Sequence, residues 1–287
     1  MYPPAVHHLW CPHCAGDLTL MLGRTLGCGN GHRFDVARQG YVNLVAGGSP
    51  HRGDNAPMVA ARARFLDRGH FSPTATAVAS MVEQALEGHA GDDDNGCVVD
   101  LGAGTGYHLG HVLDRLPGRA GIALDASRYA CRRAARAHPR IGAVVCDVWE
   151  GVPLRTATAM AVLDVFAPRN GGEMRRILHP SGVLVVATPT TSHLRELVGP
   201  LGLVTVDADK RQRVTAELDP HVVVAQRETV EHGIELDPEE VRDLVAMGPS
   251  AYHRHEDTDD HLDEAIGQLR RPVRATVSVA IALYRRR

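Results

Sequence analysis

The chain has 287 residues, of which 44% are hydrophobic and 23% are charged, and its net charge is −3. This length indicates two domains, and because no apolar run approaches the roughly 20 residues that cross a bilayer, we expect no membrane-spanning segment. The N-terminus lacks the layout of a secretory signal. We therefore expect a cytoplasmic protein whose six cysteines are thiols or metal ligands rather than disulfides.

Positive charge gathers near the N-terminus. Through residue 75 the chain has seven arginines against four aspartates, whereas the remainder is acidic. A basic segment on an acidic body suits a polyanion bound at one end. A solvated arginine face is the alternative, and the net negative charge counts mildly against an RNA substrate.

Two Cys/His pairs near the start of the chain have the spacing of a metal site. Cys11 and Cys14 form a Cys-x2-Cys pair, and Cys28 and His32 form a Cys-x3-His pair after thirteen intervening residues. Four such ligands are typical of a tetrahedral structural zinc site, which keeps no open position for a catalytic water. We predict a zinc-ribbon lobe over residues 1–50, a kind of module that often presents a surface to nucleic acid or protein.

The segment after the metal ligands leads into a second domain. Residues 34–44 alternate apolar and polar side chains and are assigned to the lobe. Residues 47–55 have the composition of a loop, and residues 58–67 have helical spacing with Arg62 and Arg64 exposed or facing a partner. We treat residues 51–75 as a linking loop and helix, and residues 51–287 as the second domain.

Five apolar runs alternate with helical segments through this second domain. We predict strands at residues 96–101, 121–124, 143–146, 160–168 and 182–189. This alternation predicts an α/β fold with a doubly wound parallel sheet, whose ligand binds at the carboxyl edge.

A glycine turn follows the first of these strands. Asp100 is followed by Gly102, Gly104 and Gly106, which allow a sharp turn into a helix that begins near residue 107. The spacing is Gly-x-Gly-x-Gly rather than the Gly-x-Gly-x-x-Gly of NAD enzymes. A glycine triad alone is weak evidence for any one cofactor, so the residues around it must indicate the ligand.

Acidic residues end the next two strands. Asp125 stands where a carboxylate binds a ribose diol, and Asp147 stands where one accepts a hydrogen bond from an adenine amino group. Each acid could instead cap a helix. Together with the glycine turn, the series favours S-adenosylmethionine as the ligand.

The C-terminal part adds a strand and an acidic stretch. An apolar run from Pro272 to Leu283 predicts a last strand, antiparallel at the edge of the sheet. Residues 256–264 are acidic and contain histidine, and a hydrated helix face is favoured over a second metal site. Cys97, Cys131 and Cys146 lie in apolar stretches and are expected to be inert core thiols.

With these motifs placed, the chain resembles the RlmA family of bacterial 23S ribosomal RNA guanine-N1 methyltransferases, including its tylosin-resistance branch. The resemblance covers nearly the whole chain and rests on residues 11–14, 31–44, 58–63, 102–106, 165–170 and 246–250. The first and fourth stretches recur in unrelated proteins, whereas the others are specific to this family.

The resemblance implies a class I (Rossmann-like) methyltransferase sheet with an N-terminal zinc-ribbon lobe. The implied cofactors are S-adenosyl-L-methionine and a structural Zn²⁺, and the implied partner is 23S ribosomal RNA, with a homodimer left open. The implied reaction is methyl transfer to N1 of a guanosine in a domain II hairpin. In the macrolide-producer branch that guanosine is at position 748, and its methylation is linked to resistance to tylosin and related mycinosylated macrolides.

Site residues follow from the resemblance position by position. It implies Cys11, Cys14, Cys28 and His32 as the zinc ligands, Gly104, Thr105 and Gly106 as cofactor contacts, and Phe71 and His193 as the lining of the cofactor pocket. Phe71 replaces the tyrosine usual in the family, so any hydroxyl contact at that position is lost here.

Two residues at the end of the fourth strand are candidates for the chemistry. We hypothesise that Asp164 assists deprotonation of guanine N1 or positions the base. Phe166 is proposed to stack on the target base, with core packing as the alternative. The RNA backbone is assigned to arginines of the lobe, its loop and the following helix, namely Arg33, Arg38, Arg52, Arg62 and Arg64.

Two other functions remain open on the sequence alone. One is a class I methyltransferase that acts on a small molecule of macrolide type and uses its zinc ribbon for stability or dimerisation, which the acidic net charge fits somewhat better. The other is a ribosome-binding protein with a vestigial cofactor fold, which the intact glycine turn disfavours. Affinity for the cofactor separates these two.

Overall fold

The computed structural model describes residues 1–47, 53–87, 96–207, 209–248 and 259–287. Arg52, most of the 47–55 loop and residues 256–258 therefore lie outside the described part. None of the described helices is long and apolar enough to cross a membrane.

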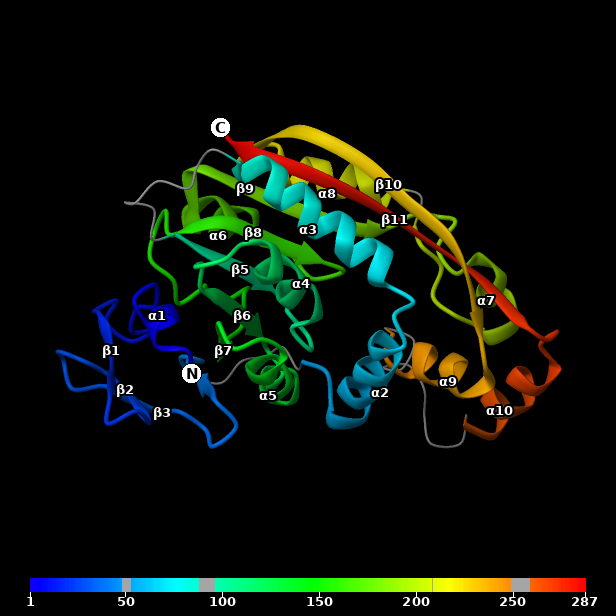
Figure 1. The fold of residues 1–287 in the computed structure, drawn as a ribbon, viewed down its shortest axis with the longest axis horizontal. Helices are drawn as coiled ribbons and strands as arrows, with labels where there is room; N and C mark the ends of the chain where they lie inside the picture. The colour runs from blue at the N-terminus through cyan, green and yellow to red at the C-terminus, as the bar shows by residue number, and fades with distance from the viewer. Residues whose placement is uncertain (48–52, 88–95, 208, 249–258) are drawn as a thin grey trace.

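An eight-stranded sheet runs through the molecule in the order β10-β11-β9-β8-β5-β6-β7-β4 (Figure 1). Its strands are β4 (Tyr41–Asn43), β5 (Cys97–Leu101), β6 (Gly121–Asp125), β7 (Ile141–Val145), β8 (Ala159–Val165), β9 (Leu178–Pro189), β10 (Val222–Leu236) and β11 (Val273–Arg286). Neighbouring strands from β4 to β9 are parallel. The predicted doubly wound parallel sheet is confirmed, and the strand order reverses between β5 and β8, which is where such sheets bind ligands.

Helices cover both faces of the sheet. Every residue of β5, β7 and β8 is buried, as expected of parallel strands covered on two sides. Because side chains alternate along a strand, Val98 belongs to the core cluster beneath α3 (Ser72–Leu86), α4 (Tyr107–Arg115) and α5 (Arg128–Ala137). Val99 belongs to the opposite cluster, with α1 (Pro3–Val6), α6 (Gly171–Ile177) and α8 (Lys210–Leu218).

The zinc ribbon shares its core with the sheet. Strands β1 (Leu18–Met21), β2 (Thr25–Cys28) and β3 (Arg33–Asp35) form a small antiparallel sheet. Its buried Leu18 and Leu26 lie in the same cluster as Val144 of β7. Residues 34–44 connect the ribbon to the main sheet: β3 pairs with β2, whereas β4 pairs parallel with β7 and buries Val42 completely. Their assignment to the lobe stays a prediction. A division of the chain at residue 50 stays a proposal.

The C-terminal strands differ from the prediction in their order. Strand β11 is antiparallel as predicted, but it lies between β9 and β10, so its predicted edge position was wrong. Strand β10 takes the edge. Its middle residues are exposed or half-buried. Its continuous apolar residues are confined to the first four, Val222 to Ala225, and the sequence after them is largely polar.

Beyond the sheet, four helices gather at the end of the molecule away from the ribbon (Figure 1). They are α2 (Ala56–Asp67), α7 (Arg195–Leu201), α9 (Pro238–Ala246) and α10 (Asp259–Gln268). The predicted helix at 58–67 is confirmed as part of α2, and α2 packs against both α5 and α9. The later cysteines are buried thiols as predicted, and burial raises the pKa of Cys97 to about 12.

Candidate active site and zinc centre

The four predicted zinc ligands lie together. Their ligand atoms are all within 4.8 Å of one another. Nδ1 of His32 is 3.5 Å from Sγ of Cys11 and 3.3 Å from Sγ of Cys28, and Sγ of Cys14 is 3.7 Å from Sγ of Cys28. Zinc bonds of about 2.3 Å to sulfur and 2.0 Å to nitrogen span tetrahedral edges of this size. The residues therefore fit a structural Zn²⁺.

Local backbone bonds shape this centre. The N–H of Cys11 donates to the carbonyl of Gly16, and the N–H of Cys28 donates to the carbonyl of His32. A backbone hydrogen bond from Gly16 lowers the pKa of Cys14 to about 6, which favours the thiolate that a metal binds. Among the described residues there is no second cluster of three or more such ligands.

The glycine turn after β5 adopts backbone conformations that favour glycine. Gly102, Gly104 and Gly106 have φ values of 67°, 55° and 79°. A Cβ at Gly102 would lie 2.6 Å from Cβ of Ala167, and one at Gly106 would lie 3.0 Å from Cα of Ala134. Both positions exclude a side chain, so the turn brings bare backbone to the carboxyl edge of the sheet.

The strand-end acids are held around this turn. Oδ2 of Asp125 accepts from the N–H of Gly104 and Oδ1 accepts from the N–H of Ser127, both at 2.8 Å. Burial still raises the pKa of Asp125. Burial, reinforced by the charges of Asp164 and Asp125, raises the pKa of Asp100 well above its usual range. Oδ1 of Asp147 accepts from the N–H of Trp149 at 3.0 Å.

A cavity of about 1,120 Å³ opens at this edge of the sheet. The predicted cofactor residues on its lining are Phe71, Asp100, Gly102, Gly104, Thr105, Asp125, Asp147 and His193. Gly106 lies outside that lining and contributes through the shape of the turn. The glycine turn and the strand-end acids Asp100, Asp125 and Asp147 together are called the cofactor cradle. Its backbone and carboxyl groups fit the hydroxyl and amino groups of S-adenosylmethionine.

Three rings meet on one side of this cavity. The ring centroid of Phe71 is 6.0 Å from that of Phe166 and 5.9 Å from that of His193, and both pairs meet edge to face. Nδ1 of His193 accepts from the N–H of Ser278 at 3.2 Å, which orients the imidazole. These contacts come from three segments far apart in the sequence, so only the fold assembles them.

Phe166 stands out by its exposure and its backbone. The residue is 41% exposed, which excludes core packing. Its φ of 57° lies in the left-handed region, where a residue with a Cβ is strained by roughly 1–2 kcal/mol, and such strain tends to gather at functional sites. Trp149, 48% exposed, lines the same cavity. Sequence reasoning missed Trp149, although its place two residues after Asp147 was a usable signal.

Asp164 is placed differently from Phe166. It is completely buried, and the described residues that line the cavity do not include it. Its Oδ1 lies 3.6 Å from Nε of Arg169, whose side chain is only 11% exposed and lines the cavity. Asp164 therefore does not face the cavity itself, but it contacts Arg169, which does.

Several arginines assigned to RNA have partners within the chain. Arg62 pairs with Asp54 and donates to the carbonyl of Met247 at 2.7 Å. Arg64 makes a two-pronged contact with Asp243 of α9. These bonds attach α2 to its neighbours. Arg33 and Arg38 are exposed on the ribbon, and Nη1 of Arg33 donates to the backbone carbonyls of Cys28 and His32.

This arrangement defines a class I S-adenosylmethionine-dependent methyltransferase that carries a zinc ribbon. Residues 9–46 match the family described as RlmA, N-terminal, a zinc ribbon. In an alignment 297 residues long, the chain is 47% identical to a candidate 23S rRNA (guanine-N1)-methyltransferase of Micromonospora griseorubida. The alignment covers 99% of each chain.

Two further relatives carry the same kind of name. The 23S rRNA (guanine(748)-N1)-methyltransferase of Streptomyces fradiae is 45% identical over 280 residues, which are 98% of this chain and 97% of that one. The candidate enzyme YxjB of Bacillus subtilis is 30% identical over 193 residues, which are 65% and 66% of the two chains. The chain belongs to the 23S rRNA (guanine-N1)-methyltransferase family, as the sequence resemblance indicated.

Proposed function

We propose that this protein transfers the methyl group of S-adenosylmethionine to N1 of a guanosine in 23S ribosomal RNA. The observation that carries the proposal is a cavity of about 1,120 Å³ that is lined both by the cofactor cradle and by the exposed, strained Phe166. Relatives named for this reaction match the chain over almost its full length.

The cofactor and the target base are assigned to different residues of this lining. Gly104 and Asp125 would hold the methionine and ribose portions of the cofactor, and Asp147 its adenine. The bound cofactor supplies an electrophilic methyl group. Phe166 offers a ring on which a base can stack, a contact that is worth about 1–3 kcal/mol per base. Alignment of N1 with the methyl group is then the main contribution of the protein.

Proton removal is the second requirement, because guanine N1 carries a proton at neutral pH. That proton passes to solvent water as the N1–C bond forms and the C–S bond breaks, and S-adenosylhomocysteine is the leaving group. Asp164 is too deeply buried to contact the base, so we assign it the role of holding Arg169 against the cavity wall. It acts as a positioning residue for Arg169, which differs from both roles that the sequence suggested for it, deprotonation of N1 and positioning of the base.

We assign RNA recognition to the zinc ribbon, in which Arg33 and Arg38 are exposed. N1 lies on the Watson–Crick edge of guanine, so the target must leave its pairing before it enters the cavity. A grip on the phosphates beside the target would hold the strand in that splayed state.

More specifically, we propose that the methylated guanosine is the one at position 748 in the domain II hairpin. Its methylation would give resistance to tylosin and other mycinosylated macrolides. The name of the Streptomyces fradiae relative supports this position. The test is primer extension across domain II after incubation of 23S RNA with the protein and S-adenosylmethionine, since an N1 methyl group stops reverse transcriptase. We expect a cofactor-dependent stop at 748. A stop at a neighbouring guanosine would overturn the position, and no stop despite cofactor binding would favour a small-molecule substrate.

A further inference from the structure

A second cavity, of about 710 Å³, adjoins the cofactor turn. It lies between α2 and α5, with α4 as a third wall. Thr105 and Gly106 of the turn line it, together with residues of these three helices. Three arginines of α5 line it as well: Arg132, Arg133 and Arg136. None of the predicted functional residues except Thr105 and Gly106 belongs to this lining.

The three α5 arginines form a group of exposed positive charge. All three are exposed, and within the described part of the chain no carboxylate lies within ion-pair distance of them. Some exposed arginines elsewhere have acidic partners, such as Arg242 with Asp263 at 2.6 Å and Arg274 with Glu235 at 3.0 Å. Others, such as Arg24 and Arg38, resemble the α5 arginines in having none within the described part of the chain. Uncompensated positive charge beside an active site favours a polyanion.

Helix α5 is fixed firmly beside the cofactor turn. Gly106 lets it approach closely, since a Cβ there would lie 3.0 Å from Cα of Ala134 and 3.1 Å from Cβ of Ala137. At its start, Oγ of Ser127 caps the helix and also donates to the carbonyl of Asp54. The arginines therefore have a fixed relation to the bound methyl donor.

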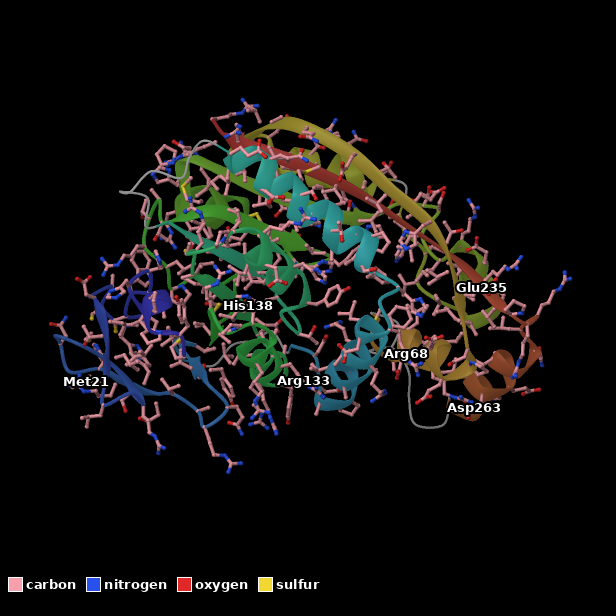
Figure 2. All side chains as sticks on the ribbon, in the orientation of Figure 1. Met21, Arg68, Arg133, His138, Glu235 and Asp263 are labelled. Carbon is pink, nitrogen blue, oxygen red and sulfur yellow. The ribbon has the colours of Figure 1, made fainter. Side chains whose placement is uncertain are left out.

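The ribbon meets the same helix. Gly40, in the turn between β3 and β4, would place a Cβ 3.6 Å from Cβ of Ala135. The exposed Arg38 lies two residues before this contact. In Figure 2 the labelled Arg133 lies on α5, between the ribbon with Met21 and the end of α2 with Arg68. Positive charge thus continues from the ribbon along α5 toward the cofactor turn.

Aromatic rings accompany the positive charge. The rings of Tyr107 and His111 are 4.7 Å apart, and both residues line the cavity with Tyr129. Asp67 and Asp114 line it too, so the positive charge is confined to the α5 wall. A groove with arginines on one wall and rings near them is suited to single-stranded nucleic acid, whose phosphates and bases bind such groups respectively.

We infer that the groove between α2 and α5 is a second RNA subsite, which holds the unpaired strand beside the target nucleotide. Arg132, Arg133 and Arg136 bind its phosphates, and Tyr129 offers a stacking surface. The inference rests on the proposed function, because it supplies the grip that keeps the target splayed. It adds an RNA contact on α5 to those expected on the ribbon.

The test replaces Arg132, Arg133 and Arg136 together by glutamine. Binding of a 23S domain II transcript is measured at several salt concentrations, and cofactor binding is measured by calorimetry. The matched control, Arg195→Gln/Arg242→Gln/Arg274→Gln, removes the same charge from the opposite end of the molecule, where Figure 2 labels the partners Glu235 and Asp263.

We expect the α5 variant to bind RNA roughly tenfold or more weakly than wild type, and the slope of log K against log salt to fall in magnitude by about 2, since each single-strand phosphate contact contributes about 0.7. Cofactor affinity stays the same in both variants. Tyr129→Leu should weaken RNA binding without changing the slope, because stacking releases few ions.

Equal salt slopes for the α5 variant, the control and wild type would overturn the subsite, even if wild type methylates the transcript. Failure of the wild-type protein to bind or methylate the transcript would overturn the proposed function itself and the subsite with it. A melting temperature close to that of wild type confirms that the α5 variant is folded.

Discussion

The backbone N–H of Gly104 donates to Oδ2 of Asp125 at 2.8 Å. This bond joins the turn after β5 to the end of β6, so the two parts of the cofactor cradle form one unit. Oδ1 of the same carboxylate accepts from the N–H of Ser127. The carboxylate is therefore oriented before any ligand arrives.

Asp125→Ala should weaken cofactor binding. Two backbone donors lose their charged acceptor, and bonds to charged groups are each worth about 1.5–3 kcal/mol, so we expect a loss of roughly tenfold or more in affinity. Calorimetry with S-adenosylmethionine measures it. Glu264→Gln, on the exposed side of α10, is the control and should bind S-adenosylmethionine like wild type. Equal cofactor affinities for wild type and both variants would show that Asp125 does not contribute to cofactor binding.

Asp100 should make the ligand-free protein less stable as pH rises. Burial raises its pKa in the folded state, so the folded state keeps a proton that the unfolded state has lost between the ordinary and the raised pKa. Stability then falls as pH increases through that window. Asp100→Asn mimics the protonated form and should raise Tm at neutral pH, with a gain that shrinks as the pH is lowered. A gain independent of pH would contradict this account.

Phe166 should affect activity and stability in opposite directions. Phe166→Gly removes the stacking ring but suits a φ of 57°, whereas Phe166→Ala removes the ring and keeps the strain. We expect both variants to lose roughly 5- to 150-fold in kcat/KM for RNA, and the glycine variant to be about 1 kcal/mol more stable than the alanine variant. Methylation kinetics and urea unfolding measure the two effects. Unchanged kcat/KM in both variants would exclude stacking on the target.

Asp164 and Arg169 should behave as a pair. If Asp164 positions Arg169, then Asp164→Asn and Arg169→Met both lower kcat, and the double variant is no worse than either single one. The pH dependence of kcat should keep its shape in Asp164→Asn. A lost acidic limb in that variant would instead identify Asp164 as the general base.

Removal of zinc should destabilise the whole protein rather than the ribbon alone. Buried Leu18 and Leu26 share a core cluster with Val144, and β4 extends the main sheet. Calorimetry with a strong chelator should therefore show a single transition at lower temperature. Two separate transitions, with the later one unmoved, would indicate a lobe that folds independently.

Features set by local spacing were predictable from the sequence. The zinc ligands lie on two short turns and were predicted from their spacing. The strand-end acids were predicted from their place directly after apolar runs. Strand β10 was missed because its apolar run is confined to Val222–Ala225, and the rest of this edge strand is largely polar.

Features set by distant contacts were not predictable. Arg62 and Arg64 have partners on or beside α9, 185 and 179 residues further along the chain. The burial of Asp164 likewise depends on neighbouring strands. The exposed arginines of α5 were visible in the sequence, but their place beside the cofactor turn comes from the packing of Ala134 against Gly106.

The central claim is methyl transfer to guanine N1, and nucleoside mass spectrometry tests it most directly. Unmodified 23S RNA is incubated with the protein and S-adenosylmethionine that carries a deuterated methyl group, then digested to nucleosides. We expect deuterated 1-methylguanosine with wild type and far less with Phe166→Ala. Label in a different nucleoside, or no label in RNA while the cofactor still binds, would contradict this claim.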